Sequence, residues 1–261
     1  MMNVVESVSD LQAWREASGD DIGLVPTMGA LHPGHTFLME RARSDHRCAV
    51  ATIFVNPTQF NDSRDLEAYP RTLDSDLEAC ERLGMDLIFC PKAQEMYPEG
   101  QVFAVTESED ALILEGACRP GHFPGVMTVV MKLLNLVRPA VAYFGEKDYQ
   151  QLRLIQKMVH AFFLPYKIVG LPTVRETDGL AMSSRNRRLS EEGRNQAPAL
   201  YNLLATSPSV TSARAGLTQA GFDVEYVEEC WGRRLAAVSL DGVRLLDNIS
   251  LDRREAHGPV H

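Results

Sequence analysis

Residues 22–35 read IGLVPTMGALHPGH, an apolar run that leads straight into a turn rich in glycine and histidine. The first five residues have the continuous apolar pattern of a strand that is buried on both faces of a parallel sheet. Pro33 suits the first turn of a helix, because the N–H that proline lacks would have no partner there. The stretch therefore predicts a strand, a tight turn and a helix over about 34–45, which is the first half of a βαβ unit.

The same alternation continues along the first two-thirds of the chain. Strand-like runs lie at 49–55, 86–90, 141–145 and 167–172, with helical patterns at 74–83, 124–137 and 149–163. After Pro172 the pattern changes to helices near 190–204 and 211–220, followed by strands at 223–229, 233–240 and 243–249. We expect a Rossmann-like doubly wound parallel sheet in a domain of residues 1–173 and a smaller C-terminal α+β lid domain of residues 174–261. Surface loops are expected at 91–101 and 115–121, and a frayed tail at 250–261.

Composition limits the classes of partner. The chain has 261 residues, 45% of them hydrophobic, and a net charge of −9. Nucleic acid and anionic membranes both require a cationic surface, so neither is expected as a partner. No apolar run approaches the length of a membrane span. The five cysteines are odd in number and widely spaced, which favours reduced thiols and a cytoplasmic location.

His32 and His35 lie where the first expected helix begins, and the N–H groups and dipole of that end attract phosphate. A tight turn with two half-exposed histidines is the alternative. Two histidines three residues apart could also share a metal ion, but no carboxylate or cysteine accompanies them, and we assign no metal ligands. The H-x-G-H pattern at a strand–helix junction resembles the nucleotidylyl-transferase superfamily, which includes class I aminoacyl-tRNA synthetases.

Two further polar segments follow expected strands. Gln59, in FVNPTQF at 54–60, offers amide donors and an acceptor to a substrate with carboxylate and hydroxyl groups. Lys147 and Gln151, in FGEKDYQQ at 144–151, would face the same side of a helix. Ligands bind beyond the carboxyl ends of strands in open α/β sheets, so all three are expected in one crevice. A capped loop and a solvated charge cluster are the competing interpretations.

The polar segment MSSRN at 182–186 lies between the two expected domains. Ser183, Ser184 and Arg185 suit a mobile loop that closes on a triphosphate, because a guanidinium binds phosphate oxygens in pairs. An interdomain linker is the alternative.

Together these four segments, in this order and spacing, resemble the pantothenate synthetase (pantoate–β-alanine ligase) family over nearly the whole chain. Supporting similarity runs through YPRT at 69–72, RPGHF at 119–123, GVMTVV at 125–130, PTVRE at 172–176 and RLLDN at 244–248. The resemblance implies an ATP- and Mg²⁺-dependent ligase. It would condense (R)-pantoate with β-alanine through pantoyl adenylate, releasing AMP and pyrophosphate, in the biosynthesis of pantothenate and coenzyme A. It also implies a homodimer formed through the larger domain.

The resemblance assigns residues as well. Gln59 and Gln151 would bind pantoate. The catalytic residues would be His35, His32, Lys147, Ser183, Ser184 and Arg185. ATP would lie against Met28, Gly29, Ala30, Leu31, His32, Pro33, Gly34, His35, Gly145, Glu146, Lys147, Asp148, Val174, Met182, Ser183, Ser184 and Arg185.

Two other functions fit part of the pattern. A nucleotidyltransferase that acts on a phosphate ester would share H-x-G-H and the sheet, but it would not need Gln59 and Gln151 for a hydroxy acid. A non-catalytic regulator would bind ATP without forming AMP. Fold alone does not separate these functions from the ligase.

Overall fold

The computed structural model describes residues 2–252, so the expected tail lies outside the described residues from 253 onward. The chain folds into two compact units, Met1–Pro172 and Thr173–His261, and each is described by itself. This division falls one residue before the boundary that the sequence predicts.

The larger unit is built on one parallel sheet of six strands. In spatial order they are β1 (Asn3–Val5), β4 (Leu87–Phe89), β3 (Cys48–Ile53), β2 (Ile22–Thr27), β5 (Val141–Gly145) and β6 (Lys167–Leu171). The strands after β2 are added on one side of it, and the chain then crosses to its other side at β5. Such a reversal opens a crevice at the carboxyl ends of the two neighbouring strands. The predicted doubly wound sheet is confirmed.

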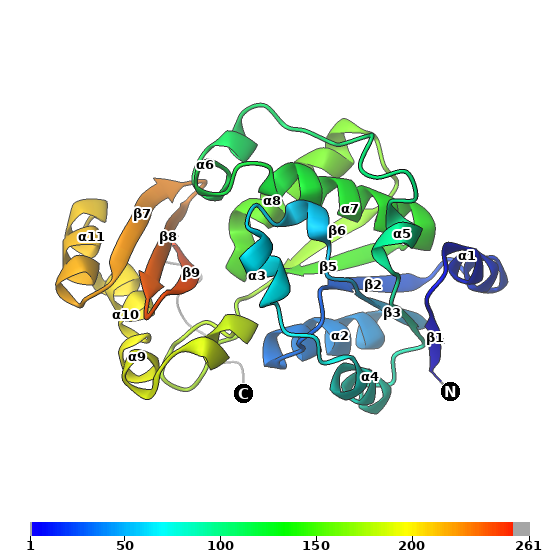
Figure 1. Ribbon diagram of the computed structural model, residues 1–261, viewed down its shortest axis with the longest axis horizontal. Coiled ribbons are helices and arrows are strands. Elements are labelled where there is room, and N and C mark those ends of the chain that lie inside the picture. The colour runs from blue at the N-terminus through cyan, green and yellow to red at the C-terminus, as the bar shows by residue number, and fades with distance from the viewer. Residues whose placement is uncertain (1, 253–261) are drawn as a thin grey trace. The chain divides into compact units, whose positions relative to one another are not determined.

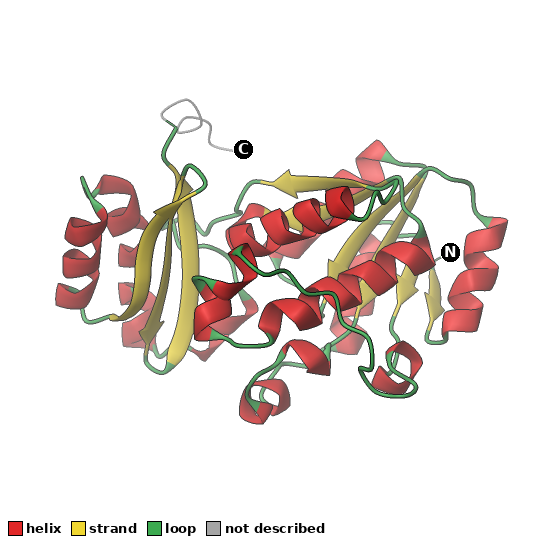
Figure 2. Cartoon of the chain, turned by 90° about the horizontal axis from the view of Figure 1, so that it is seen from above, coloured by secondary structure: helices red, strands yellow, loops and turns green. Residues whose placement is uncertain are grey.

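Helices cover both faces of this sheet (Figures 1 and 2). The helix α7 (His122–Val137) packs with both α1 (Val8–Ala17) and α8 (Tyr149–Ala161), and α2 (Pro33–Asp45) packs with α4 (Leu73–Arg82). The strands supply both cores because neighbouring side chains point to opposite faces. Leu24 joins the core that contains α7 and α8, whereas Val25 joins the core that contains α2. Full burial of such a side chain contributes about 1.5–3 kcal/mol.

Short elements connect the strands to the long helices. They are the 3₁₀ turns η1 (Pro57–Gln59), η2 (Asp110–Leu112) and η3 (Glu146–Asp148), and the helices α3 (Ser63–Glu67), α5 (Ala93–Met96) and α6 (Glu115–Cys118). Because α5 and α6 are helical, the expectation of plain loops at 91–101 and 115–121 is wrong there. Each is a four-residue turn, too short for an apolar repeat to show in the sequence.

The smaller unit contains an antiparallel sheet of β7 (Asp223–Cys230), β8 (Arg233–Leu240) and β9 (Val243–Ser250). Its two hairpins turn at Trp231-Gly232 and Asp241-Gly242, where all four residues have positive φ, the conformation of a tight type I′ turn. Preceding the sheet are η4 (Ser184–Arg188), α9 (Glu191–Gln196), α10 (Ala199–Thr206) and α11 (Val210–Gln219). The single helix expected over 190–204 is divided, because Pro198 cannot continue a helix from its interior.

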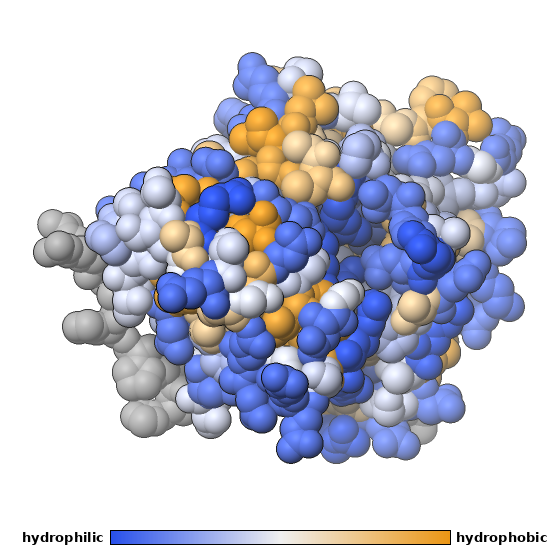
Figure 3. All heavy atoms as spheres, turned by 60° about the vertical axis from the view of Figure 1, so that its left-hand side comes forward, coloured by the Kyte–Doolittle hydropathy of each residue, from blue (hydrophilic) through white to orange (hydrophobic). Residues whose placement is uncertain are grey.

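Hydrophilic side chains dominate the face in Figure 3, and the apolar atoms form small separate areas. Within residues 2–252, no helix has both the length and the apolar character that a bilayer crossing requires.

Candidate active site

A cavity of about 160 Å³ lies at the carboxyl ends of β2, β3 and β5 in the larger unit. Residues from several segments of that unit line it: Pro26, Thr27, Met28, His35, Phe54, Asn56, Gln59, Tyr69, Val126, Val129, Val130, Leu133, Phe144, Asp148 and Gln151. The strand reversal at β2 and β5 places the cavity there, since the turns after both strands meet at that edge.

His32 and His35 stand together at the start of α2. Their ring centroids are 4.0 Å apart, and His32 is the N-cap residue, whose Nδ1 accepts a hydrogen bond from the Gly34 N–H at 3.1 Å. An accepting Nδ1 leaves the proton of a neutral imidazole on Nε2. His32 can therefore donate from Nε2 while it caps the helix through Nδ1.

His35 contributes a neutral ring to the cavity. Its pKa is lowered to about 4, mainly by burial; Asp148 opposes this change and Lys147 adds to it. Its Nδ1 is buried and has no hydrogen-bond partner among residues 2–252. Buried polar atoms are normally paired, so this nitrogen is available to a ligand that enters the cavity.

Gln59 is held in one orientation by its neighbours. Its Oε1 accepts a hydrogen bond from Asn56 Nδ2 at 3.0 Å, and its Nε2 lies 3.1 Å from Met28 Sδ. The Tyr97 hydroxyl donates to Asn56 Oδ1 at 3.0 Å, which fixes the Asn56 amide in turn. Since Oε1 accepts from Asn56 and one hydrogen of Nε2 is donated to Met28 Sδ, the second amide hydrogen remains to bind an oxygen of a substrate.

The backbone of Gln59 is fixed from the other side by α7. His122 is buried, and its Nδ1 lies 2.9 Å from the Gln59 carbonyl oxygen, to which it donates. Burial, with Arg119 nearby, lowers the pKa of His122 to about 4. Gly125 makes this close approach possible, because a Cβ there would lie 2.4 Å from the Thr58 carbonyl oxygen. His122 therefore supports the Gln59 segment.

These two histidines should make stability depend on pH. Their folded pKa values lie near 4, below the ordinary 6.5, so the unfolded chain binds more protons between pH 6.5 and 4. Stability should therefore be complete above pH 6.5 and fall as the pH drops toward 4, by on the order of 3 kcal/mol per histidine. Urea unfolding between pH 7.5 and 4.5 measures this loss. His122→Asn should flatten the curve and the exposed His160→Asn should not; equal slopes for all three proteins would contradict the assignment.

One wall of the cavity is apolar. Val126, Val129, Val130 and Leu133 lie at positions i, i+3, i+4 and i+7 of α7, which places them on one face of the helix, and all four line the cavity. Phe54 and Phe144 complete this wall from the ends of β3 and β5. A ligand with a compact branched hydrocarbon group fits such a wall, and Gln59 offers a polar contact in the same cavity.

Charged residues follow β5. Lys147 lies in η3 with its side chain 19% exposed, and its Nζ is 3.5 Å from Asp148 Oδ1. Asp148 and Gln151 both line the cavity, as expected for residues that begin α8. The ammonium group of Lys147 acts on the ring of His35, so the segments after β2 and β5 are electrostatically coupled.

The remaining predicted residues belong to the smaller unit. Val174 and Met182 are paired across a short hairpin, in which the Met182 N–H donates to the Val174 carbonyl at 3.0 Å. Ser183 caps η4, and its Oγ accepts a hydrogen bond from the Arg185 N–H at 3.2 Å. Ser184 and Arg185 lie in the first turn of η4. These five residues thus form one local cluster, and their contact with ATP stays a prediction.

The structure therefore gathers part of the predicted set directly around one cavity: Met28, His35, Gln59, Asp148 and Gln151. Gly29 to Gly34 and Gly145 to Lys147 lie in the same two turns without lining it. Sequence reasoning assigned no role to Tyr97 or Leu133. The four-residue spacing from Val129 to Leu133 was a usable signal for the second, but a tyrosine hydroxyl that reaches Asn56 from the end of α5 has no local signal.

Comparison with known proteins places this geometry in a family. A family model described as pantoate-beta-alanine ligase matches residues 3–250. A pantothenate synthetase from Bdellovibrio bacteriovorus is 52% identical over 251 residues, which cover 96% of this chain and 100% of that protein.

Two solved structures point to the same family. A pantothenate synthetase from Thermus thermophilus superposes with a TM-score of 0.89 at 41% identity, covering 96% of this chain and 99% of that one. The pantoate-beta-alanine ligase of Francisella tularensis, solved with beta-gamma ATP and beta-alanine, gives 0.92 at 37% identity, with coverage of 96% and 98%. The sheet, the two histidines after β2 and these matches lead to one conclusion: the chain belongs to the pantoate–β-alanine ligase family and is an ATP-dependent ligase that forms pantothenate.

Proposed function

We propose that the protein makes pantothenate in two steps within the cavity after β2, β3 and β5. In the first, a carboxylate oxygen of (R)-pantoate attacks the α-phosphorus of ATP, and the bond to the β-phosphate breaks to release pyrophosphate. In the second, the amine of β-alanine attacks the acyl carbon, AMP leaves and the amine loses a proton. The adenylate step supplies the leaving group that a carboxylate lacks.

The observation that favours this proposal most is the presence of both a polar amide and an apolar surface in one cavity. Gln59 lines the cavity with an amide group, and Val126, Val129 and Val130 of α7 line it with hydrocarbon. Pantoate combines a carboxylate and hydroxyls with a gem-dimethyl group, so both of its halves find a matching surface. Gln151 is the second proposed pantoate contact.

ATP is assigned to the turns after β2 and β5, from Met28 to His35 and from Gly145 to Asp148. His32 and His35 donate hydrogen bonds to phosphate oxygens, and Lys147 neutralises charge that grows on the leaving pyrophosphate. A histidine with a pKa near 4 is neutral at pH 7, which favours hydrogen-bond donation by His35 over acid catalysis. Positioning and charge stabilisation then provide most of the acceleration.

Mg²⁺ completes the proposal as the partner of ATP, whose phosphate charge it reduces. Among residues 2–252 no group of three His, Cys, Asp or Glu side chains could hold a metal ion. The donor set therefore suits an ion that keeps several waters and is held mainly by the phosphates.

Residues 174–261 are proposed as a lid domain. Val174, Met182, Ser183, Ser184 and Arg185 form its ATP-facing cluster, with Arg185 and the two hydroxyls acting on the phosphates. We also place the enzyme in the cytoplasm, in the biosynthesis of pantothenate and coenzyme A, a location that the odd number and spacing of the cysteines support.

The deciding experiment follows pyrophosphate, AMP and pantothenate after mixing purified protein with Mg-ATP and D-pantoate, with and without β-alanine. Pyrophosphate that depends on pantoate, followed by AMP and pantothenate only when β-alanine is present, is the expected result. Pyrophosphate released only with a phosphorylated acceptor would indicate a nucleotidyltransferase instead. ATP binding without AMP in any mixture would indicate a regulator.

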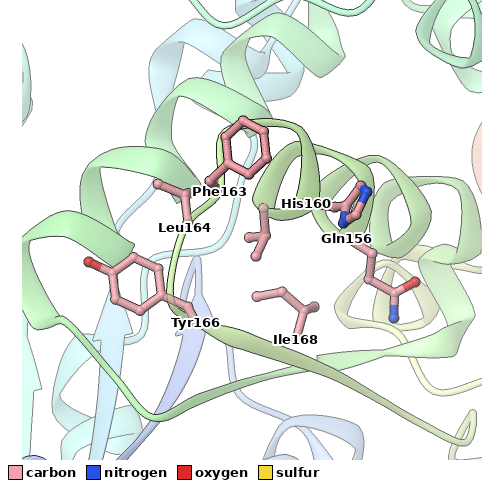
Figure 4. Close-up of a pocket in the computed structure, with 7 residues that line it drawn as sticks. Gln156, His160, Phe163, Leu164, Tyr166 and Ile168 are labelled. Carbon is pink, nitrogen blue, oxygen red and sulfur yellow. The ribbon is translucent and has the colours of Figure 1, made fainter.

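A homodimer through the larger unit is also proposed. The strand β6 ends the sheet, and among the described strands only β5 pairs with it, so its other edge offers backbone groups to a second strand. Beside it lies a groove of about 480 Å³ (Figure 4), lined by Gln156, Val159, His160, Phe163, Leu164, Tyr166 and Ile168. In a dimer with twofold symmetry, a second copy of the chain would cover both the outer edge of β6 and the groove.

Sedimentation equilibrium tests this contact. Phe163 is 91% exposed beside the groove, so Phe163→Asp should shift the wild-type dimer to monomer. Phe103 is 87% exposed elsewhere, and Phe103→Asp should leave the dimer intact. A monomeric wild type, or a Phe163→Asp dimer as stable as the control, would reject the proposed surface.

A further inference from the structure

Asp76 is a buried carboxylate whose partners lie far away in the sequence. It stands in the first part of α4 and is 3% exposed. The Ala30 N–H donates to its Oδ2 and the Leu31 N–H to its Oδ1, each at 2.9 Å. One side chain thus binds two successive amides of the segment that joins β2 to α2.

This segment needs an external support. Gly29 has a φ of +79° and Ala30 a φ of +51°, so two successive residues adopt the left-handed conformation. That conformation is costly for alanine, which has a Cβ. In this turn the N–H groups of Ala30 and Leu31 point toward one carboxylate, and converging backbone N–H groups of a turn form anion-binding sites. In this protein the anion at that point is the carboxylate of Asp76.

The carboxylate is itself fixed. Thr72 is the N-cap residue of α4, yet its hydroxyl makes no capping hydrogen bond and donates to Asp76 Oδ2 at 3.0 Å. There is also little space beside Gly29. A Cβ at this position would lie 3.0 Å from Asp76 Oδ2 and 3.1 Å from Ile53 Cγ2. Thr72, Asp76 and the turn at 29–31 therefore form one closely fitted unit.

We propose that Asp76 is a positioning residue for the adenylation step: by binding the amides of Ala30 and Leu31, it fixes the turn from which His32 and His35 reach the phosphates of ATP. This inference rests on the proposed function. Leu31 directly precedes His32, so a displaced turn moves the cap of α2 and both rings with it. Asp76 touches no substrate in this role and acts only through the backbone.

The test compares Asp76→Asn with Asp74→Asn. Both changes remove one negative charge from the first turn of α4, but Asp74 is exposed. In Asp76→Asn an amide N–H₂ faces one of the two backbone N–H groups, which then loses its acceptor. A shift of about 1 Å can cost about 100-fold in rate, so kcat for pantoate-dependent pyrophosphate release should fall about 30- to 100-fold. Asp74→Asn should stay within about twofold of wild type.

A second readout separates positioning from general destabilisation. Supplied pantoyl adenylate and β-alanine should react in Asp76→Asn at a rate within about fivefold of wild type, because the triphosphate is already gone. The KM for pantoate should also change little. An equal loss in both half-reactions, or an Asp76→Asn variant as active as Asp74→Asn, would overturn the proposal. A wild type without pantoate-dependent pyrophosphate would instead reject the proposed function.

Thr72→Val provides a milder variant should Asp76→Asn fail to fold. It keeps both amide bonds and removes only the hydroxyl that orients the carboxylate. Adenylation should slow by about three- to tenfold, the usual effect of losing one hydrogen bond, with the second half-reaction unchanged. Adenylation at the wild-type rate, or an equal loss in both steps, would overturn the proposal here too.

Discussion

His35→Ala is expected to lower kcat for pyrophosphate release about 100- to 1,000-fold, the usual loss when one donor to a developing charge is removed. The ring lines the cavity, its pKa near 4 keeps it neutral at pH 7, and its buried Nδ1 has no partner among the described residues. A ligand oxygen is the natural partner for such a ring. A pre-steady-state assay of pyrophosphate with Mg-ATP and D-pantoate measures the effect directly.

The control is His160→Ala, which removes an exposed histidine of α8 that lines the groove proposed for the dimer and lies outside the cavity. It should keep full activity. Relative to the wild type, His35→Ala should lose less stability at pH 5 than at pH 7, since it removes a group that folds only in its neutral form. Activity within about tenfold of wild type would show that His35 does not act on the reacting phosphates.

Gly125→Ala is expected to damage both stability and substrate binding. The new Cβ would lie 2.4 Å from the Thr58 carbonyl oxygen and 2.7 Å from the Gln59 Cα, and neither backbone atom can rotate away. Overpacking of this kind destabilises by about 1–3 kcal/mol. The displacement also moves Gln59, so the KM for pantoate should rise at least about tenfold, as expected for one lost hydrogen bond to a charged group.

Thermal unfolding and pantoate titration check the two effects separately. Gly19→Ala is the matched control, because a Cβ there would meet no heavy atom within 4 Å. It should leave the KM unchanged and stability within about 0.5 kcal/mol. Should Gly125→Ala raise the KM no more than Gly19→Ala does, the close packing of α7 on η1 would have no part in substrate binding.

The sequence predicted the doubly wound sheet because β2, β3, β4 and β5 are apolar runs, the pattern that burial on both faces requires. It did not predict β1 or α1. β1 has only three residues, two of them exposed, and α1 alternates few apolar residues with many polar ones. Packing against the rest of the larger unit stabilises both elements, and the local sequence pattern does not reveal such contacts.

The sequence predicted residues of the site only where a short motif contains the side chains that would carry the chemistry. His35, Gln59 and Gln151 each follow a strand, so the topology of the sheet places them at one edge. Their supports come from other parts of the chain. Tyr97 reaches Asn56, and Asp76 reaches Ala30, through contacts that neither local sequence suggests. The family match then selects a pantothenate-forming ligase over a phosphate-ester nucleotidyltransferase, a choice that the fold left open.

The reversal of strand order at β2 also determines when the site can form during folding. Leu24 pairs with Ala142, so the turn with His32 and the turn with Lys147 meet only after the long intervening chain has closed. Closing so large a loop is entropically costly and slow compared with forming helices. A growing chain that ends before β5 has no complete nucleotide site, and the appearance of ATP binding could not precede the pairing of β2 with β5.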